Sequence, residues 1–128
     1  MPESGQRAVA IVDDDPGVRG ALNSLLAAIG HRVRTFASAG DFQKADIRAF
    51  TCLILDHHMP EMTGLRLAEH LRGEGSLIPI ILVTGFPSPA IEARAAQLGI
   101  ERVLEKPLNE QDLLGFIESS LQQRELDD

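Results

Sequence analysis

Residues 52–56 read Cys52-Leu53-Ile54-Leu55-Asp56, four apolar side chains followed by a carboxylate. Apolar residues at consecutive positions are typical of a strand buried on both faces, as in a parallel sheet, whereas a strand with one face in water alternates apolar and polar residues. A second run of this kind, Ile78–Val83, is interrupted only by Pro79 near its start. The two runs predict a parallel sheet covered on both faces.

Three further short segments complete a regular alternation of strands and helices. They are Ala8–Val12, Val33–Phe36 and Arg102–Leu104. Each of the five segments is followed by turn or capping residues and then by a helical pattern, in which apolar residues recur at three- to four-residue spacing. This order predicts a single α/β domain, (βα)₅, with a doubly wound parallel sheet of five strands and helices on both faces.

Capping residues mark the expected helix boundaries. Those predicted to begin helices are Asp15, Ser38, Ser88 and Asn109. Ser38 with Asp41 resembles a capping box for a weak second helix that we expect to reach about Arg48. The last helix is expected to carry apolar residues as far as Leu121. Residues 5–121 are therefore expected to form the core of one domain spanning residues 1–128, with residues 122–128 as a polar tail.

Composition narrows the possible functions. The chain has 128 residues and a formal charge of −7, which argues against nucleic-acid binding driven by basic residues. The single cysteine, Cys52, cannot form an internal disulfide. The sequence has no signal-peptide pattern and no apolar run long enough to span a membrane. We expect a cytoplasmic protein without membrane partners.

Polar side chains stand where four of the predicted strands end. Asp13 and Asp14 follow the first strand, Asp56 the third, Thr84 the fourth and Lys106 the fifth. Ligands of open parallel sheets bind beyond the carboxyl ends of the strands. Clustered carboxylates favour a hard divalent cation such as Mg²⁺, and an ammonium group with a hydroxyl can hold phosphoryl oxygens. A carboxylate in such a pocket is a competent nucleophile toward phosphorus.

Over nearly its whole length the chain resembles the response-regulator receiver domain of two-component signalling. The matching segments are Ile11-Val12-Asp13-Asp14-Asp15-Pro16, Leu53-Ile54-Leu55-Asp56-His57-His58-Met59-Pro60, Met62-Thr63-Gly64, Val83-Thr84-Gly85 and Glu105-Lys106-Pro107. The resemblance implies a flavodoxin-like strand order 2-1-3-4-5. It also implies a phosphoryl group donated by a sensor histidine kinase, in a protein that is not itself an enzyme.

The resemblance further assigns residue roles, with Mg²⁺ as the cofactor and Mn²⁺ as an alternative. It implies Asp56 as phosphoacceptor; Asp13, Asp14, Asp56 and the backbone carbonyl of His58 as metal ligands; Thr84, Gly85 and Lys106 as phosphate-binding and switch residues; and Pro107 after a cis peptide bond. The partners that it implies are an output domain or target protein, and a second copy of the chain in a phosphorylation-dependent dimer. They would bind the face made by the fourth helix, fifth strand and fifth helix.

One departure from the family concerns switching. Val103 stands where many receivers carry an aromatic residue that moves inward with the threonine. We therefore expect the response to be concentrated in residues 84–89 and the start of the fourth helix. His58 and Phe86, each two residues past a site residue, are expected to tune the lifetime of the phosphate.

Other interpretations predict different chemistry; a nucleotide-binding domain is disfavoured because no glycine-rich phosphate loop follows the first strand, and three more remain. Asp13-x-Asp15 is similar to the motif of haloacid-dehalogenase-type phosphatases, which would carry the phosphate on Asp13, although Gly17 departs from that motif. A receiver-like module that only binds partners is the second. The third, a zinc site at His57 and His58, lacks further ligands at suitable spacing.

Overall fold

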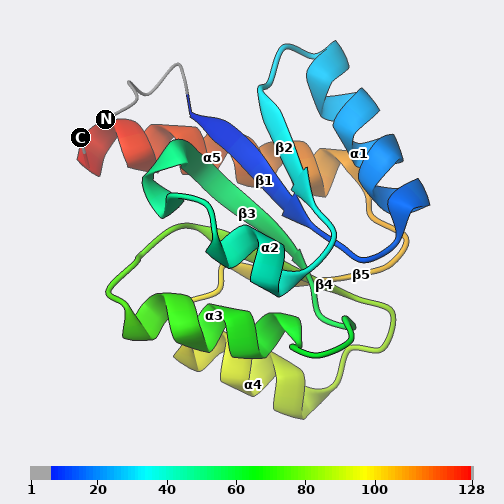
Figure 1. Cartoon of the computed structure of the whole chain (residues 1–128), viewed down its shortest axis with the longest axis vertical. Helices are drawn as coiled ribbons and strands as arrows, with labels where there is room; N and C mark the ends of the chain where they lie inside the picture. Colours follow the sequence, from blue (N-terminus) through cyan, green and yellow to red (C-terminus); the bar gives the residue numbers. More distant parts are fainter. Residues whose placement is uncertain (1–6, 128) are drawn as a thin grey trace.

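The strands form a single parallel sheet in a computed structural model that describes residues 7–127. In chain order they are β1 (Ala8–Val12), β2 (Val33–Phe36), β3 (Phe50–Asp56), β4 (Ile80–Thr84) and β5 (Arg102–Glu105). Their spatial order is β2-β1-β3-β4-β5, and every neighbouring pair is parallel (Figure 1). The predicted doubly wound sheet and its strand order are confirmed.

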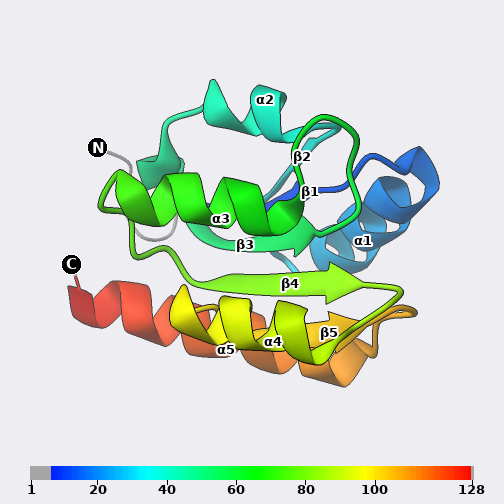
Figure 2. The same ribbon diagram turned by 90° about the horizontal axis from the view of Figure 1, so that it is seen from below.

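Helices cover both faces of the sheet (Figure 2). They are α1 (Pro16–Ala28), α2 (Ala39–Gln43), the 3₁₀ turn η2 (Ile47–Ala49), α3 (Gly64–Gly73), α4 (Pro89–Gln97) and α5 (Glu110–Asp127). α1 and α5 pack on one face, and α2, α3 and α4 pack on the other. Alternate strand residues serve the two layers, since Leu53 and Leu55 face α3 while Cys52 and Ile54 face α5. The continuous apolar runs of the sequence are explained by this double burial.

Two predicted helix boundaries differ from the structure. The second helix ends at Gln43 and not near Arg48, because the Asp46 carboxylate accepts a hydrogen bond from Arg48 N (2.9 Å) and starts the separate turn η2. The first half of the expected capping box is present, with Asp41 N donating to Ser38 Oγ at 3.1 Å. The polar tail expected from residue 122 is helical as far as Asp127, since it contains no glycine or proline that would end α5.

The guanidinium group of Arg72 joins three segments at the ends of α3 and α4. It donates to the carbonyls of Leu98 (2.7 Å), Ser76 (3.1 Å) and Ile78 (2.9 Å), and more weakly to that of Gly99 (3.4 Å). Burial lowers the pKa of Arg72. The residue thus provides donors for the carbonyl at the C-cap of α4 and for two carbonyls in the loop between α3 and β4.

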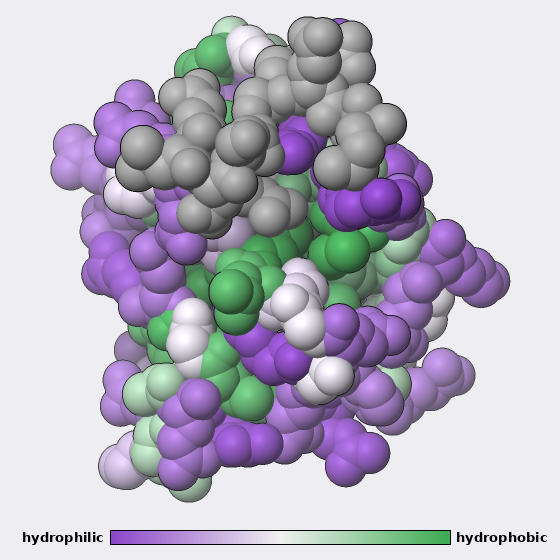
Figure 3. Space-filling model, turned by 90° about the vertical axis from the view of Figure 1, so that its left-hand side faces the viewer, coloured by the Kyte–Doolittle hydropathy of each residue, from purple (hydrophilic) through white to green (hydrophobic). Residues whose placement is uncertain are grey.

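The strands begin on the left-hand side of Figure 1, and Figure 3 shows the surface of the molecule on this side. Hydrophilic side chains surround an apolar area there. Leu77, in the loop before β4, has 79% of its surface exposed.

Among residues 7–127, no helix combines the length and apolarity that a membrane span requires. The predicted site residues all lie at the opposite, carboxyl ends of the strands.

Candidate functional site

Three carboxylates meet beyond the ends of β1 and β3. Asp13 and Asp56 are almost fully buried, with 4% and 2% of their surfaces exposed, whereas Asp14 is exposed. One carboxylate oxygen from each lies within 4.8 Å of the other two. The sheet brings these residues together because β1 and β3 are paired, with Val12 opposite Leu55. The predicted acidic cluster is present.

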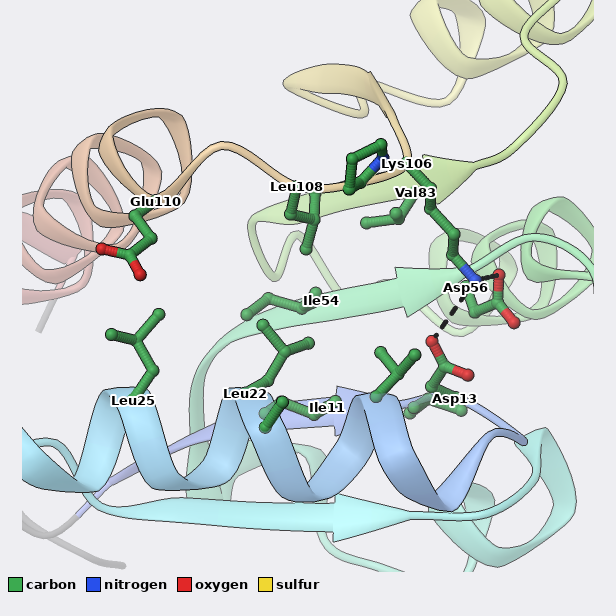
Figure 4. Close-up of a pocket in the computed structure, with 14 residues that line it drawn as sticks. Ile11, Asp13, Leu22, Leu25, Ile54, Asp56, Val83, Lys106, Leu108 and Glu110 are labelled. Atoms are coloured by element: carbon green, nitrogen blue, oxygen red, sulfur yellow. Dashed lines mark ion pairs between the residues drawn. The ribbon is translucent and has the colours of Figure 1, made fainter.

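Lys106 forms ion pairs with the two buried carboxylates of this cluster. Its Nζ atom lies 3.1 Å from Asp56 Oδ1 and 3.6 Å from Asp13 Oδ2 (Figure 4). Burial alone would lower the pKa of Lys106, but the hydrogen bonds and charges of Asp56 and Asp13 outweigh it and raise that pKa. Lys106 N donates to the carbonyl of Thr84 (2.9 Å), and the following bond to Pro107 is cis, as the resemblance implied. The ammonium group is therefore held charged beside both buried acids.

Asp13 remains electrostatically strained despite this partner. Burial raises its pKa above the usual value, and the nearby charge of Asp56 adds to the effect. A hydrogen bond from Asp15 N to Asp13 Oδ1 (2.9 Å) and the charge of Lys106 lower the pKa by less. One ammonium group thus stands against three carboxylates, so the cluster carries an excess of negative charge that a divalent cation would neutralise.

The donor set fits a hard cation. Within the described residues, the group of side chains that could hold a metal consists of Asp13, Asp14 and Asp56, so that each donor is a carboxylate oxygen. Mg²⁺ prefers such ligands and completes its octahedron with water and carbonyl oxygens. Neither His57 nor His58 belongs to this group, which gives the zinc alternative no support.

Gly64 lets α3 begin directly against the end of β3. A β-carbon at this position would lie 2.6 Å from the carbonyl oxygen of Asp56 and 2.8 Å from Leu82 Cδ1. Gly64 N donates to the carbonyl of His57 (3.1 Å), and His57 N donates to that of Val83 (2.9 Å). The loop after Asp56 is therefore fixed against β4. No role was predicted for Gly64, although it belongs to a segment that resembles the family.

The Thr84 hydroxyl is fully buried at the end of β4. It accepts a hydrogen bond from Phe86 N (3.0 Å) and forms a second hydrogen bond, of 2.7 Å, with His58 Nε2. The His58 ring makes edge-on contacts with His57 and Phe86, at centroid distances of 4.9 Å and 5.9 Å. The bond between His58 and Thr84 was not predicted, because the two residues are 26 positions apart.

An apolar cleft of about 560 Å³ extends from the acidic cluster between α1 and the start of α5 (Figure 4). Asp13, Asp56 and Lys106 stand at one end of it. Its remaining lining is largely aliphatic and includes Leu22, Leu25, Ile11, Ile54 and Leu108. The acidic cluster thus lies at one end of an apolar cleft, with residues of β1 and β3 in the cleft wall.

A parallel 2-1-3-4-5 sheet with an acidic pocket at the carboxyl ends of its strands defines a flavodoxin-like domain of the CheY type. Residues 9–118 match the family model described as the response regulator receiver domain. The chain belongs to this family, whose members act in two-component systems.

Relatives and solved structures agree with this assignment. The response regulator protein TmoT of Ectopseudomonas mendocina is 41% identical over 117 residues, which are 91% of this chain and 53% of TmoT. The structure of the response regulator StyR is similar with a TM-score of 0.85 and 38% identity, over 92% of this chain and 60% of StyR. A CheY-like receiver domain from Methanospirillum hungatei JF-1 also has a TM-score of 0.85, with 28% identity over 95% of this chain and 98% of that one. The chain spans about half the length of the curated relatives.

Proposed function

We propose that this domain accepts a phosphoryl group on Asp56 from a sensor histidine kinase and thereby regulates an output domain or a separate target protein. The observation that carries the proposal is the position of Asp56, which ends a central strand beside two other acids and 3.1 Å from Lys106. The proposal places the domain in the cytoplasm. It assigns no catalytic turnover to the chain, which assists its own phosphorylation and dephosphorylation.

In the proposed transfer, an Asp56 carboxylate oxygen attacks phosphorus while the bond from phosphorus to the kinase histidine nitrogen breaks. Asp13, Asp14, Asp56 and the backbone carbonyl of His58 would hold Mg²⁺, or Mn²⁺ in its place. The cation, when bound, supplies positive charge that offsets repulsion between the carboxylates and the phosphoryl group. Lys106 and the Thr84 hydroxyl, with Gly85 beside it, then hold phosphoryl oxygens.

The signal is proposed to leave through α4, β5 and α5, the face that would bind a target or a second copy of the chain. Val103 is partly buried against the core layer of α2, α3 and α4 and is too short to act as an aromatic lever. Phe86, in contrast, follows the switch threonine closely and has 79% of its surface exposed. Movement of residues 84–89 therefore carries the response, and His58 and Phe86 tune the phosphate lifetime by controlling access of water.

The test is phosphorylation by acetyl phosphate in Mg²⁺, followed by intact-mass measurement and peptide mapping. One base-labile phosphoryl group is expected, and Asp56→Asn should abolish it because an amide is not nucleophilic. Labelling of Asp13 would indicate the dehalogenase-type phosphatase instead. A protein that takes no label but keeps its binding partner would be an interaction module.

A further inference from the structure

The hydroxyl group of Thr84 has a limited bonding capacity that its present partners largely use. A threonine hydroxyl has one proton to donate and two lone pairs that can accept. Phe86 N donates to one lone pair. The His58 Nε2 atom, 2.7 Å away, either accepts a hydrogen bond from the hydroxyl or donates one to its second lone pair, depending on the tautomer. In both cases this short bond fixes the position of the oxygen, and in the first case it also uses the only proton.

This bond conflicts with the role that the proposed function gives to Thr84. A phosphoryl oxygen on Asp56 would need the hydroxyl to turn toward Asp56 and to donate its proton. That movement separates the Thr84 oxygen from His58. Because Thr84 is fully buried, its hydroxyl cannot exchange one partner for water at no cost. His58 and the phosphoryl group therefore compete for the same hydroxyl.

We propose that His58 is a positioning residue that holds the Thr84 hydroxyl in its unphosphorylated orientation, and that phosphorylation acts by breaking this bond. The inference rests on the proposed function and adds a residue that opposes the switch. It concerns the side chain of His58, whereas the metal-binding role implied for this residue belongs to its backbone carbonyl.

Breaking the bond has a structural consequence at the surface. The His58 ring lies edge-on against Phe86, and Phe86 N is itself bonded to the Thr84 hydroxyl. Departure of the hydroxyl therefore removes one contact from His58 and one from the backbone of Phe86 together. Both side chains are exposed, so the change is presented directly to a partner. This route does not require an aromatic residue at Val103.

Two substitutions of His58 separate the hydrogen bond from the ring contact. His58→Phe keeps a ring next to Phe86 but cannot bond the hydroxyl, and His58→Gln keeps an amide that can bond it without a ring. We expect His58→Phe to tighten the binding of beryllofluoride with Mg²⁺ by roughly threefold to tenfold, the factor that one net hydrogen bond represents. His58→Gln should return the affinity toward that of the unmodified protein. Amide NMR of Phe86 during the titration measures both.

The control is the same pair of measurements in a Thr84→Val background, which removes the hydroxyl and keeps the branched shape. If His58 acts through Thr84, His58→Phe should leave the affinity for beryllofluoride nearly unchanged in the Thr84→Val background. An equal gain in both backgrounds, or no gain in either, overturns the proposal. Failure of the unmodified protein to bind beryllofluoride, or binding that survives Asp56→Asn, would instead overturn the proposed phosphoacceptor function.

Discussion

The first residue of α3, Gly64, touches the backbone of Asp56 so closely that a side chain has no room between them. A β-carbon on Gly64 would lie 2.6 Å from the Asp56 carbonyl oxygen and 3.0 Å from His57 Cα. Both neighbours are backbone atoms, which cannot turn aside as a flexible side chain can. The position of the Asp56 carboxylate therefore depends on the absence of a side chain eight residues later.

Gly64→Ala should displace the end of β3. We expect it to lower the free energy of unfolding by about 1–3 kcal/mol, the usual cost of overpacking, and to slow phosphorylation by acetyl phosphate. The matched control is Gly73→Ala at the other end of α3, where nothing lies within 4 Å of the added carbon. That variant should keep its phosphorylation rate. Equal behaviour of the two variants in urea unfolding would contradict the close contact.

Asp13→Asn should stabilise the protein in the presence of a chelator at pH 7, by on the order of 1 kcal/mol. Burial raises the pKa of Asp13, so the native state binds a proton more readily than the unfolded chain. The free energy of unfolding therefore falls as the pH rises from 3.8, the ordinary pKa of an aspartate, through the raised pKa of Asp13. Above the raised pKa, the whole destabilising effect of the buried charge remains. The advantage of the asparagine variant should disappear below pH 3.8. Thermal melts over this range measure the difference, and a less stable variant at pH 7 would refute the argument.

Lys106→Met should have the opposite effect under the same conditions. The pKa of Lys106 is raised, so its contribution is complete below 10.5 and is lost as pH rises through the raised value. We expect the free energy of unfolding to fall by about 1–3 kcal/mol at pH 7. This is less than the loss on breaking a fully buried ion pair, because 32% of the Lys106 side chain is exposed. The loss should shrink in alkaline solution. A loss that is independent of pH would assign Lys106 a packing role only.

If Mg²⁺ binds the acidic cluster, it should raise the melting temperature, because the three carboxylates are brought together only in the folded chain. At a hundredfold excess over its dissociation constant, the cation adds about 2.7 kcal/mol to stability. Asp14→Asn should remove most of this increment while changing the metal-free protein little, since Asp14 is exposed. Glu101→Gln, which removes an exposed acid in the turn before β5, is the charge-matched control. Identical magnesium shifts in the two variants would place the ion elsewhere.

Arg72→Met should destabilise the protein by about 2–3 kcal/mol, because it leaves several buried or half-buried carbonyls without a donor. Arg72→Lys should not restore stability, since a single ammonium group lacks the geometry of the guanidinium fork. Arg102→Met, which breaks only the exposed pair with Asp112 (3.4 Å), should cost at most about 0.5 kcal/mol. Urea unfolding of the three variants provides the comparison.

The sheet was predictable because a strand that is buried on both faces has apolar residues at nearly every position. Continuous apolar runs identified β3 and β4, and the alternation of strands with capped helices determined the layers. The end of α2 was not predictable, because it depends on Asp46, whose carboxylate caps η2 instead of remaining in a longer helix. The length of α5 was underestimated, since polarity after Leu121 was interpreted as the end of a helix.

The acidic cluster was equally accessible from sequence, because parallel strands place their carboxyl ends along one edge. Contacts that depend on loop conformation were not. The bond between His58 and Thr84 requires the loop after β3 to turn back across β4, and the contact between Gly64 and Asp56 requires the following helix to begin at that point. Neither arrangement leaves a periodic signal in the sequence.

The pocket side chains stand at the ends of four separate strands, and helical connections divide each strand from the next along the chain. A truncated or partly folded chain could therefore carry every one of these residues and still have no pocket, because β1, β3, β4 and β5 must all be paired before the residues meet. Assembly of the acidic pocket thus requires that the sheet has formed across all four of these strands. Under the proposed function, an incompletely folded copy would therefore not be phosphorylated by the kinase.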